Sequence, residues 1–152
     1  MEIERKFLIN ELPDLKSFSF KKLSQAYIST TPVIRLRQMD TDFFLTVKSS
    51  GHLSREEFEM LISEGEYRTL LKKVEGHPIE KERYYIPLSQ DLTAELDVYH
   101  GFLEGLFTVE VEFPSKEAAL SFKPPSWFGE DITFDARYKN NMLSLHGKPQ
   151  NK

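Results

Sequence analysis

The chain has 152 residues and no cysteine, which excludes disulfide bonds and thiolate metal sites. Any metal must therefore be held by oxygen or imidazole ligands, and a lack of disulfides fits a cytoplasmic protein. The sequence contains no run of about 18 apolar residues, so no membrane-spanning helix is expected. It begins directly in charged sequence, without the layout of a signal peptide. A net charge of −4 disfavours non-specific binding to nucleic acid or anionic lipid, although it allows a local cationic pocket.

The hydrophobic content of 39% and the charged content of 29% are typical of a globular protein, and the length predicts one domain over residues 1–152. Strand-like runs lie at residues 2–9, 22–29, 33–39, 43–49, 54–62, 79–88, 94–100 and 107–113. Helices are predicted at 64–74, 115–122 and 135–145, with a proline-interrupted connection at 123–130. Short turn-like gaps between several of the runs indicate antiparallel hairpins.

Charged side chains gather on one face of most of these strands when the runs are read with a period of two. They are Glu2, Glu4 and Lys6, then Arg35 and Arg37, Lys48, Glu57 and Glu59, Lys81 and Arg83, Glu95 and Asp97, and finally Glu110 and Glu112. The opposite faces are largely apolar, as at Leu36, Val47 and Val109. Arg5 interrupts the apolar face of the first run, and the sequence gives no reason for it.

On a single antiparallel strand, a charged face is usually a solvated face that needs no function. Repeated pairs of like charge on successive strands are harder to explain in this way, because such neighbours repel each other. They make sense when cations neutralise the acids and a polyanion neutralises the bases. A surface built from so many strands is expected to curl into a barrel with a polar interior. Carboxylates favour Mg²⁺ or Mn²⁺, whereas arginine and lysine bind phosphate oxygens, so the pattern predicts metal-assisted phosphoryl transfer.

The order of the charged motifs resembles that of the CYTH superfamily, the triphosphate tunnel metalloenzymes. A Glu-x-Glu-x-Lys motif at Glu2, Glu4 and Lys6 is followed by "IRLRQ", "LTVKS", "SREEFE", "EKERY", "ELDVY" and "VEVEF". The first motif alone is weak evidence, but the ordered set covers nearly the whole chain and is specific. The ending "PPSWFGEDIT…DARYKNNML" is similar to that of the short bacterial members.

The resemblance implies a mainly β fold with flanking helices (α+β), in which an eight-stranded antiparallel β-barrel binds a small anionic triphosphate in its charged lumen. It favours a cytoplasmic, Mg²⁺- or Mn²⁺-dependent hydrolase that releases the terminal phosphate of inorganic tripolyphosphate. An organic substrate is the alternative: thiamine triphosphate, a nucleoside triphosphate, or ATP cyclised to cAMP. A non-catalytic polyphosphate-binding module or a protein–protein adaptor would be alternatives of another class. No partner nucleic acid or membrane is expected, and a homodimer is left open.

The site residues follow from the resemblance, position by position. Lys6, Arg35, Arg37, Lys48, Lys81 and Arg83 would bind the phosphates, joined by Lys139 if it reaches the tunnel mouth and is not a solvated helix lysine. Glu2, Glu4, Glu57, Glu59, Asp97, Glu110 and Glu112 would bind metal, Asp97 matching its motif better than Glu95. Lys81, Tyr27, Glu57 and Glu59 are the catalytic candidates. Tyr27 would share the inward face with Gln25 and Ser29 and bond the phosphates or Lys81, unless it is an ordinary strand aromatic.

Overall fold

The computed structural model describes residues 2–49 and 53–149 and confirms the mainly β fold. The strands are β1 (Glu2–Ile9), β2 (Phe20–Thr30), β3 (Val33–Met39), β4 (Asp42–Lys48), β5 (Ser54–Arg55), β6 (Glu57–Ile62), β7 (Glu75–Pro87), β8 (Thr93–Tyr99), β9 (Phe107–Glu112) and β10 (Phe128–Asp131). The helices are α1 (Glu64–Leu71), α2 (Lys116–Ser121) and α3 (Asn140–His146), with short 3₁₀ turns η1 (Gly101–Leu103) and η2 (Ala136–Tyr138).

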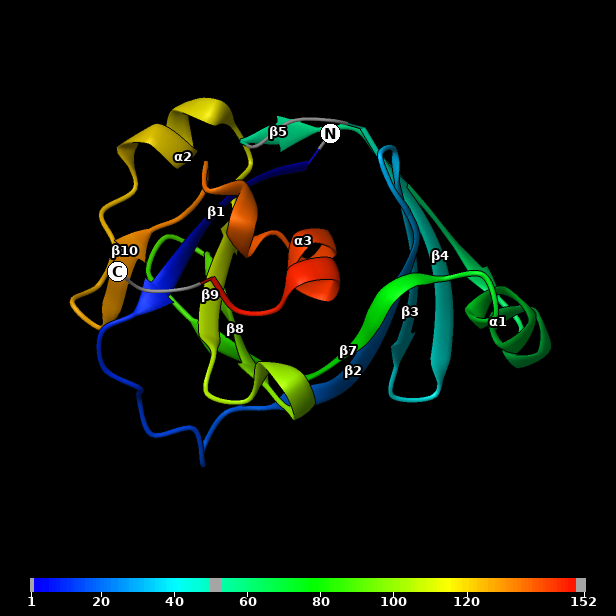
Figure 1. The fold of residues 1–152 in the computed structure, drawn as a ribbon. Coiled ribbons are helices and arrows are strands. Elements are labelled where there is room, and N and C mark those ends of the chain that lie inside the picture. Colours follow the sequence, from blue (N-terminus) through cyan, green and yellow to red (C-terminus); the bar gives the residue numbers. More distant parts are fainter. Residues whose placement is uncertain (1, 50–52, 150–152) are drawn as a thin grey trace.

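The strands form one antiparallel sheet in the order β10-β1-β9-β8-β7-β2-β3-β4-β6, which curls into a nearly closed barrel (Figure 1). β5 completes most of the closure, because it pairs with β1 while β6 pairs with β4. Only Glu56 separates these two strands, so the predicted strand 54–62 crosses from one side of the barrel to the other. Each of the eight predicted runs forms strand. The additional strand β10 lies partly in the segment predicted as a connection and extends the sheet beside β1.

Some boundaries differ from the predictions for local reasons. Helix α1 ends at Leu71, before the end of the predicted helix 64–74. Strand β7 begins at Glu75, before the start of the predicted strand 79–88. Gly76, with a φ of +66°, lies inside β7 where the register with β2 shifts between Glu75 and Ile79. The predicted helix 135–145 is divided at Lys139, whose extended backbone (φ −67°, ψ 140°) separates η2 from α3.

The main apolar core lies outside the barrel wall, because the inward faces of the strands are charged. Its buried members include Phe7, Leu96, Val109 and Val111, covered by residues of α2 and β10. Arg5 belongs to this layer. Its guanidinium donates to the backbone oxygen of Ala119 at 2.9 Å and pairs with the Asp131 carboxylate at 2.9 Å, and so ties α2 and β10 to β1. Its position on the apolar face is therefore structural.

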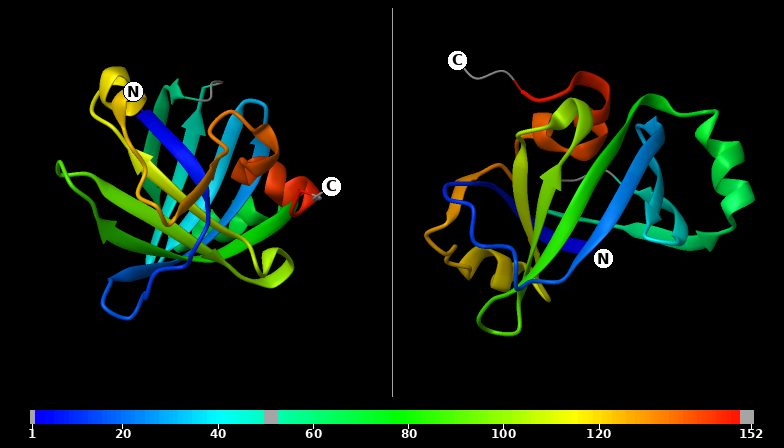
Figure 2. Two further views of the ribbon diagram at one scale, coloured as in Figure 1. Left: turned by 90° about the vertical axis from the view of Figure 1, so that its left-hand side faces the viewer. Right: turned by 90° about the horizontal axis from the view of Figure 1, so that it is seen from below.

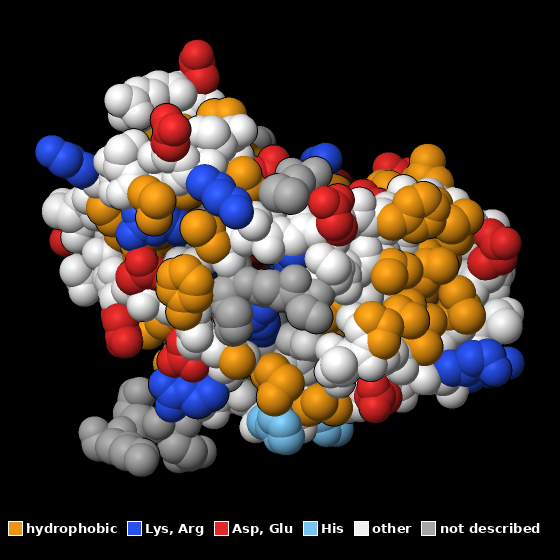
Figure 3. All heavy atoms as spheres, turned by 90° about the horizontal axis from the view of Figure 1, so that it is seen from above, with side chains coloured by type: hydrophobic (Ala, Val, Ile, Leu, Met, Phe, Trp, Pro, Cys, Tyr) orange, Lys and Arg blue, Asp and Glu red, His pale blue; other side chains and the backbone are white. Residues whose placement is uncertain are grey.

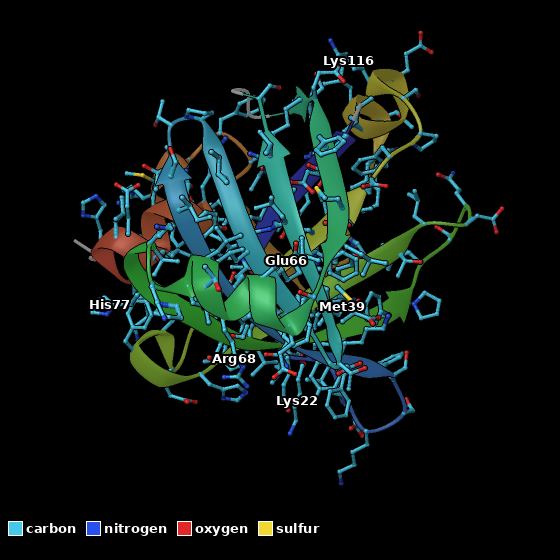
Figure 4. All side chains as sticks on the ribbon, turned by 90° about the vertical axis from the view of Figure 1, so that its right-hand side faces the viewer. Lys22, Met39, Glu66, Arg68, His77 and Lys116 are labelled. Atoms are coloured by element: carbon cyan, nitrogen blue, oxygen red, sulfur yellow. The ribbon has the colours of Figure 1, made fainter. Side chains whose placement is uncertain are left out.

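Two further helices cover other parts of the barrel (Figure 2). Helix α1 begins with a capping box between Ser63 and Glu66 and lies across the outer side of the strands, where Tyr67 packs on Phe43 (Figure 4). Helix α3 lies at one end of the barrel, beside β7, where the Ser144 hydroxyl donates to the backbone oxygen of His77 at 2.6 Å.

A hydrophobic surface remains over β4, β6 and the neighbouring α1, on the right-hand side of Figure 3. Its exposed side chains include Val47 of β4 and Phe58 and Met60 of β6, which share the outward face of these strands. No helix among the described residues is long and apolar enough to cross a bilayer.

Candidate active site

The lumen contains a cavity of about 230 Å³ whose wall is mostly charged. Its acidic residues are Glu2, Glu4, Glu57, Glu59, Glu95, Glu110, Glu112 and Asp135. Its basic residues are Lys6, Arg35, Arg37, Lys48, Arg55, Arg83 and Lys139. The charges come from strands all around the barrel and from the C-terminal segment, so side chains far apart in the sequence face a common space.

The strand register explains how the acids meet. Glu4 is paired with Glu112 and Lys6 with Glu110 across β1 and β9. Cross-strand partners project from the same face. The period-two reading therefore identified the inward positions correctly on these strands.

Lys48 and Arg35 neutralise part of this acidic surface. The Lys48 ammonium lies 3.2 Å from Glu2 and 3.7 Å from Glu57, so it bridges β1 and β6 across the lumen. Arg35 lies 3.7 Å from Glu59 and 3.9 Å from Glu57. Both cations are almost fully buried, and buried charges are stable only when they are paired in this way.

Lys81 and Asp97 do not line the cavity; they lie behind its surface, in the barrel wall. Asp97 receives two short hydrogen bonds from Arg83, at 2.8 and 3.0 Å, and also pairs with Lys81. Burial lowers the pKa of Lys81 to about 7, although Asp97 opposes the shift. The neighbouring acid Glu95 does line the cavity, 3.3 Å from Arg83. Both acids lie on the inward face of β8, but Glu95 lines the cavity whereas Asp97 lies behind its surface and supports Arg83.

Arg37 is the least compensated cation of the cavity. Its Nε atom is buried without a hydrogen-bond partner among the described residues, as is the Nε of Arg35. Burial, together with the nearby charges of Arg35 and Arg83, lowers the pKa of Arg37 to about 9, so it stays protonated at neutral pH. Unpartnered buried donors on two adjacent arginines indicate a place for an anion.

The acids of β1 and β9 are crowded. Burial and the nearby carboxylates of Glu110 and Glu2 raise the pKa of Glu4 well above its usual value. Burial and Glu2 also raise the pKa of Glu112. Burial alone would raise the pKa of Glu110 as well, but Lys6, Arg83 and Lys81 hold it low. Such crowding stores repulsion that a proton or a metal cation at Glu4 relieves.

Tyr27 and Lys139 both line the cavity, as the resemblance implied for Lys139. Tyr27 accepts a hydrogen bond of 3.0 Å from the amide of the fully buried Gln25, which leaves the phenol proton to be donated elsewhere. Burial lowers the pKa of Lys139 to about 8, with a smaller contribution from Arg55. Lys6 donates to the backbone oxygen of Tyr138 at 2.6 Å, so the C-terminal segment is fastened directly to β1.

The sequence reading missed five polar residues that line the cavity: Arg55, Thr133, Asp135, Asn140 and Asn141. Arg55 could have been found, because it stands two residues before Glu57 and four before Glu59, on the same face. The other four lie in the C-terminal segment, where Thr133 follows β10 and the remaining three belong to the predicted helix 135–145. Their inward position depends on how the C-terminal segment packs across the end of the barrel.

The residues present fit a hard divalent cation, since the inward acids supply only carboxylate oxygens. Among the described residues, no three acidic or histidine side chains are already gathered at metal-binding distance. The acids are instead engaged with cations of the chain, as Glu2 is with Lys48 and Arg55. Glu2, Glu4 and Glu112, which the resemblance implies as metal ligands, all line the cavity from the neighbouring strands β1 and β9.

Comparison with known proteins agrees with this geometry. The model of the CYTH domain matches residues 1–133. An inorganic triphosphatase of Nitrosomonas europaea is 47% identical over 148 residues, covering 95% of this chain and 97% of the relative. An inorganic triphosphatase of Acetivibrio thermocellus is 34% identical, covering 93% and 92%. A crystal structure of an inorganic triphosphatase superposes with a TM-score of 0.73 and 41% identity, covering 98% of this chain and 97% of that one. The chain therefore belongs to the CYTH domain family.

Proposed function

We propose that the protein hydrolyses the terminal phosphate of inorganic tripolyphosphate, with Mg²⁺ or Mn²⁺, to give pyrophosphate and phosphate. The observation that carries the proposal is the pair Arg35 and Arg37, which line the cavity and whose buried Nε donors lack hydrogen-bond partners among the described residues. The two inorganic triphosphatase relatives support the same substrate.

The lumen favours a bare polyphosphate over a nucleotide. The apolar part of its wall consists of Val33, Ile132 and the tyrosines Tyr27 and Tyr138. Tyr27 is buried and engaged with Gln25, and the Tyr138 backbone is tied to Lys6. These residues form no open aromatic face on which a base could stack, which is the usual means of holding a nucleobase.

The basic residues of the cavity would bind the phosphate oxygens. Arg37 has an unpartnered Nε donor and can make charge-assisted contacts, whereas Arg83 is oriented by its paired bonds to Asp97. Lys81 supports Arg83 through the shared carboxylate rather than touching substrate. Lys6, Lys48 and Lys139 would complete the set from β1, β4 and the C-terminal segment.

Glu2, Glu4, Glu110 and Glu112 would hold a divalent cation on the β1–β9 side of the lumen. When bound, that cation would neutralise phosphate charge and lower the pKa of a water molecule. Glu57 and Glu59 are only partly buried, with 28% and 37% of their side chains exposed, and so are suited to accept a proton from the attacking water. The free phenol proton of Tyr27 can be donated to a phosphate oxygen.

The direct test is phosphate release from tripolyphosphate by the purified protein, with Mg²⁺, with Mn²⁺ and with EDTA. ATP and thiamine triphosphate serve as parallel substrates. Metal-dependent release from tripolyphosphate alone is the expected result. Turnover of an organic triphosphate in its place would overturn the substrate, and tight binding without turnover of any of the three would indicate a binding module.

Two variants test the site. Arg37→Ala and Glu4→Gln should each lower the turnover of tripolyphosphate by roughly 100-fold or more, the usual effect of removing a charge-stabilising group from a closed site. Arg68→Ala is the control, because Arg68 lies on α1, outside the barrel, and 72% of its side chain is exposed (Figure 4). Turnover near the wild-type rate in either site variant would contradict the assignment.

A further inference from the structure

We propose that Arg55 has two successive partners: it is the counterion of Glu2 and Glu4 in the metal-free protein, and it becomes a phosphate ligand once a divalent cation takes over those carboxylates. The second half of this inference rests on the proposed function, whereas the first half concerns the metal-free chain alone.

The backbone of Arg55 is fixed at the point where the barrel closes. Arg55 is paired with Glu2 in the β5–β1 ladder, and the neighbouring Glu4 amide donates to the backbone oxygen of Leu53 at 3.1 Å. The Arg55 side chain is 17% exposed and lines the cavity. Whatever its side chain does, its Cα stays beside the acids of β1, within reach of the lumen.

The guanidinium of Arg55 spans the two leading carboxylates. Its Nε lies 3.5 Å from Glu2 Oε1, and one terminal nitrogen lies 3.6 Å from Glu4 Oε1. One planar cation thus engages two acids that would otherwise repel each other across two residues of the same strand. Part of the negative charge gathered at the start of β1, above all that of Glu2, is thereby compensated without a metal.

These contacts are loose compared with the pair that Arg83 forms with Asp97. Arg83 holds Asp97 with two bonds of 2.8 and 3.0 Å in a buried site, the geometry of a fixed bidentate pair. The Arg55 contacts are at least half an ångström longer. At such distances a charged contact is weaker than a short bidentate hydrogen-bonded pair. We therefore expect Arg83 to keep its contact with Asp97, and Arg55 to exchange its contacts with Glu2 and Glu4 for others.

A divalent cation competes directly with Arg55 for Glu2 and Glu4, because both need the same carboxylate oxygens. A displaced Arg55 cannot leave the lumen, since its backbone is paired with β1. Its planar fork then matches a phosphate group, which it can bind with two parallel hydrogen bonds. Binding of the metal would thereby free the Arg55 guanidinium to bind the substrate.

The test compares Arg55→Gln and Arg55→Lys with the control Arg68→Gln. Mn²⁺ binding is measured by calorimetry on protein stripped of metal and without triphosphate. Loss of the competing charge should make Arg55→Gln bind Mn²⁺ about fivefold more tightly, with Arg55→Lys closer to the wild type. Unchanged or weaker Mn²⁺ binding by Arg55→Gln would overturn the counterion role, and a merely structural role for Arg55 would also give weaker binding.

The phosphate role is tested separately by KM and kcat at saturating Mn²⁺. Arg55→Gln should raise the KM for tripolyphosphate by at least about tenfold, the effect of losing a charged hydrogen bond, and Arg55→Lys should raise it less. An unchanged KM would contradict this role. If the wild type releases no phosphate at all, the proposed function has failed, while the Mn²⁺ measurement still decides the counterion role.

Discussion

Lys81 and Asp97 form an ion pair inside the barrel wall, with the Lys81 ammonium 2.7 Å from the Asp97 carboxylate and at most 1% of either side chain exposed. Arg83 approaches the same carboxylate from the lumen side. One acid therefore holds two cations, and only one of these, Arg83, reaches the cavity.

Replacing Asp97 with Asn should destabilise the protein even when no metal is present. The change leaves two buried cations without their shared counterion, which typically costs about 3–5 kcal/mol. Chemical denaturation in EDTA measures the loss. Glu95→Gln is the matched control, because Glu95 is two residues away, 38% exposed and on the cavity surface, and it should change the stability by less than about 1 kcal/mol. A normal stability of Asp97→Asn in EDTA would instead favour Asp97 as a metal ligand.

The pair Asp97 and Glu95 also shows where sequence reading reaches its limit. Period-two alternation places both side chains on the inward face of β8, and the structure agrees. Alternation does not tell which of the two lies at the surface of the lumen and which lies behind it. That difference arises from the cross-strand partners, since Asp97 is opposite Arg83 and Thr108 while Glu95 is opposite Glu110.

The strands could be predicted from the sequence more accurately than the C-terminal segment that packs across the end of the barrel. The inward acids and bases of β1, β3, β4, β6 and β9 follow from a regular pattern that the backbone geometry enforces. The division of residues 135–145 at Lys139 depends on contacts with distant strands, such as the bond from Asn141 to the backbone of Thr30. No local pattern encodes such a contact. The register by which Arg55 joins β5 to β1 is equally non-local.

Arg5→Ala should loosen the outer layer without touching the lumen. The variant loses hydrogen bonds to the backbone of Ala119 and to Asp131, and the Arg5 contact with the Phe7 ring. Hydrogen bonds involving a charged group contribute about 1.5–3 kcal/mol, so a destabilisation of that size is expected. Thermal and urea unfolding measure it. The exposed Arg68→Ala should shift stability by less than about 0.5 kcal/mol, and an equal effect of the two variants would refute the anchoring role.

Deprotonation of Lys139 should lower the activity at high pH. With a pKa of about 8, Lys139 is cationic below that value and loses its charge as the pH rises through it. The kcat/KM for tripolyphosphate, which reports ionisations of the free enzyme, should therefore fall above about pH 8. Lys139→Gln should lower kcat/KM at pH 7 and abolish this fall. A profile of the variant parallel to that of the wild type would exclude Lys139 as the titrating group.

Gly76→Ala should displace α3. Gly76 has a φ of +66°, and a Cβ there would lie 2.6 Å from the backbone oxygen of Ser144. Gly101→Ala is a close control, because its φ is +65° but its Cβ would meet no described atom within 4 Å. In both variants the left-handed backbone should lower the stability by roughly 1–2 kcal/mol. Only Gly76→Ala should also lower tripolyphosphate turnover, since Asn140 and Asn141 reach the cavity from α3, and equal effects on turnover would argue against this coupling.

The barrel is closed by the pairing of β5 with β1, a ladder of only two residue pairs. Every other neighbouring pair along the ring from β1 to β6 is joined by a longer ladder, so the circumference is held most weakly where Arg55 and Glu2 face each other. Backbone amides of β5 should consequently exchange their hydrogens with solvent well before those of β8 and β9.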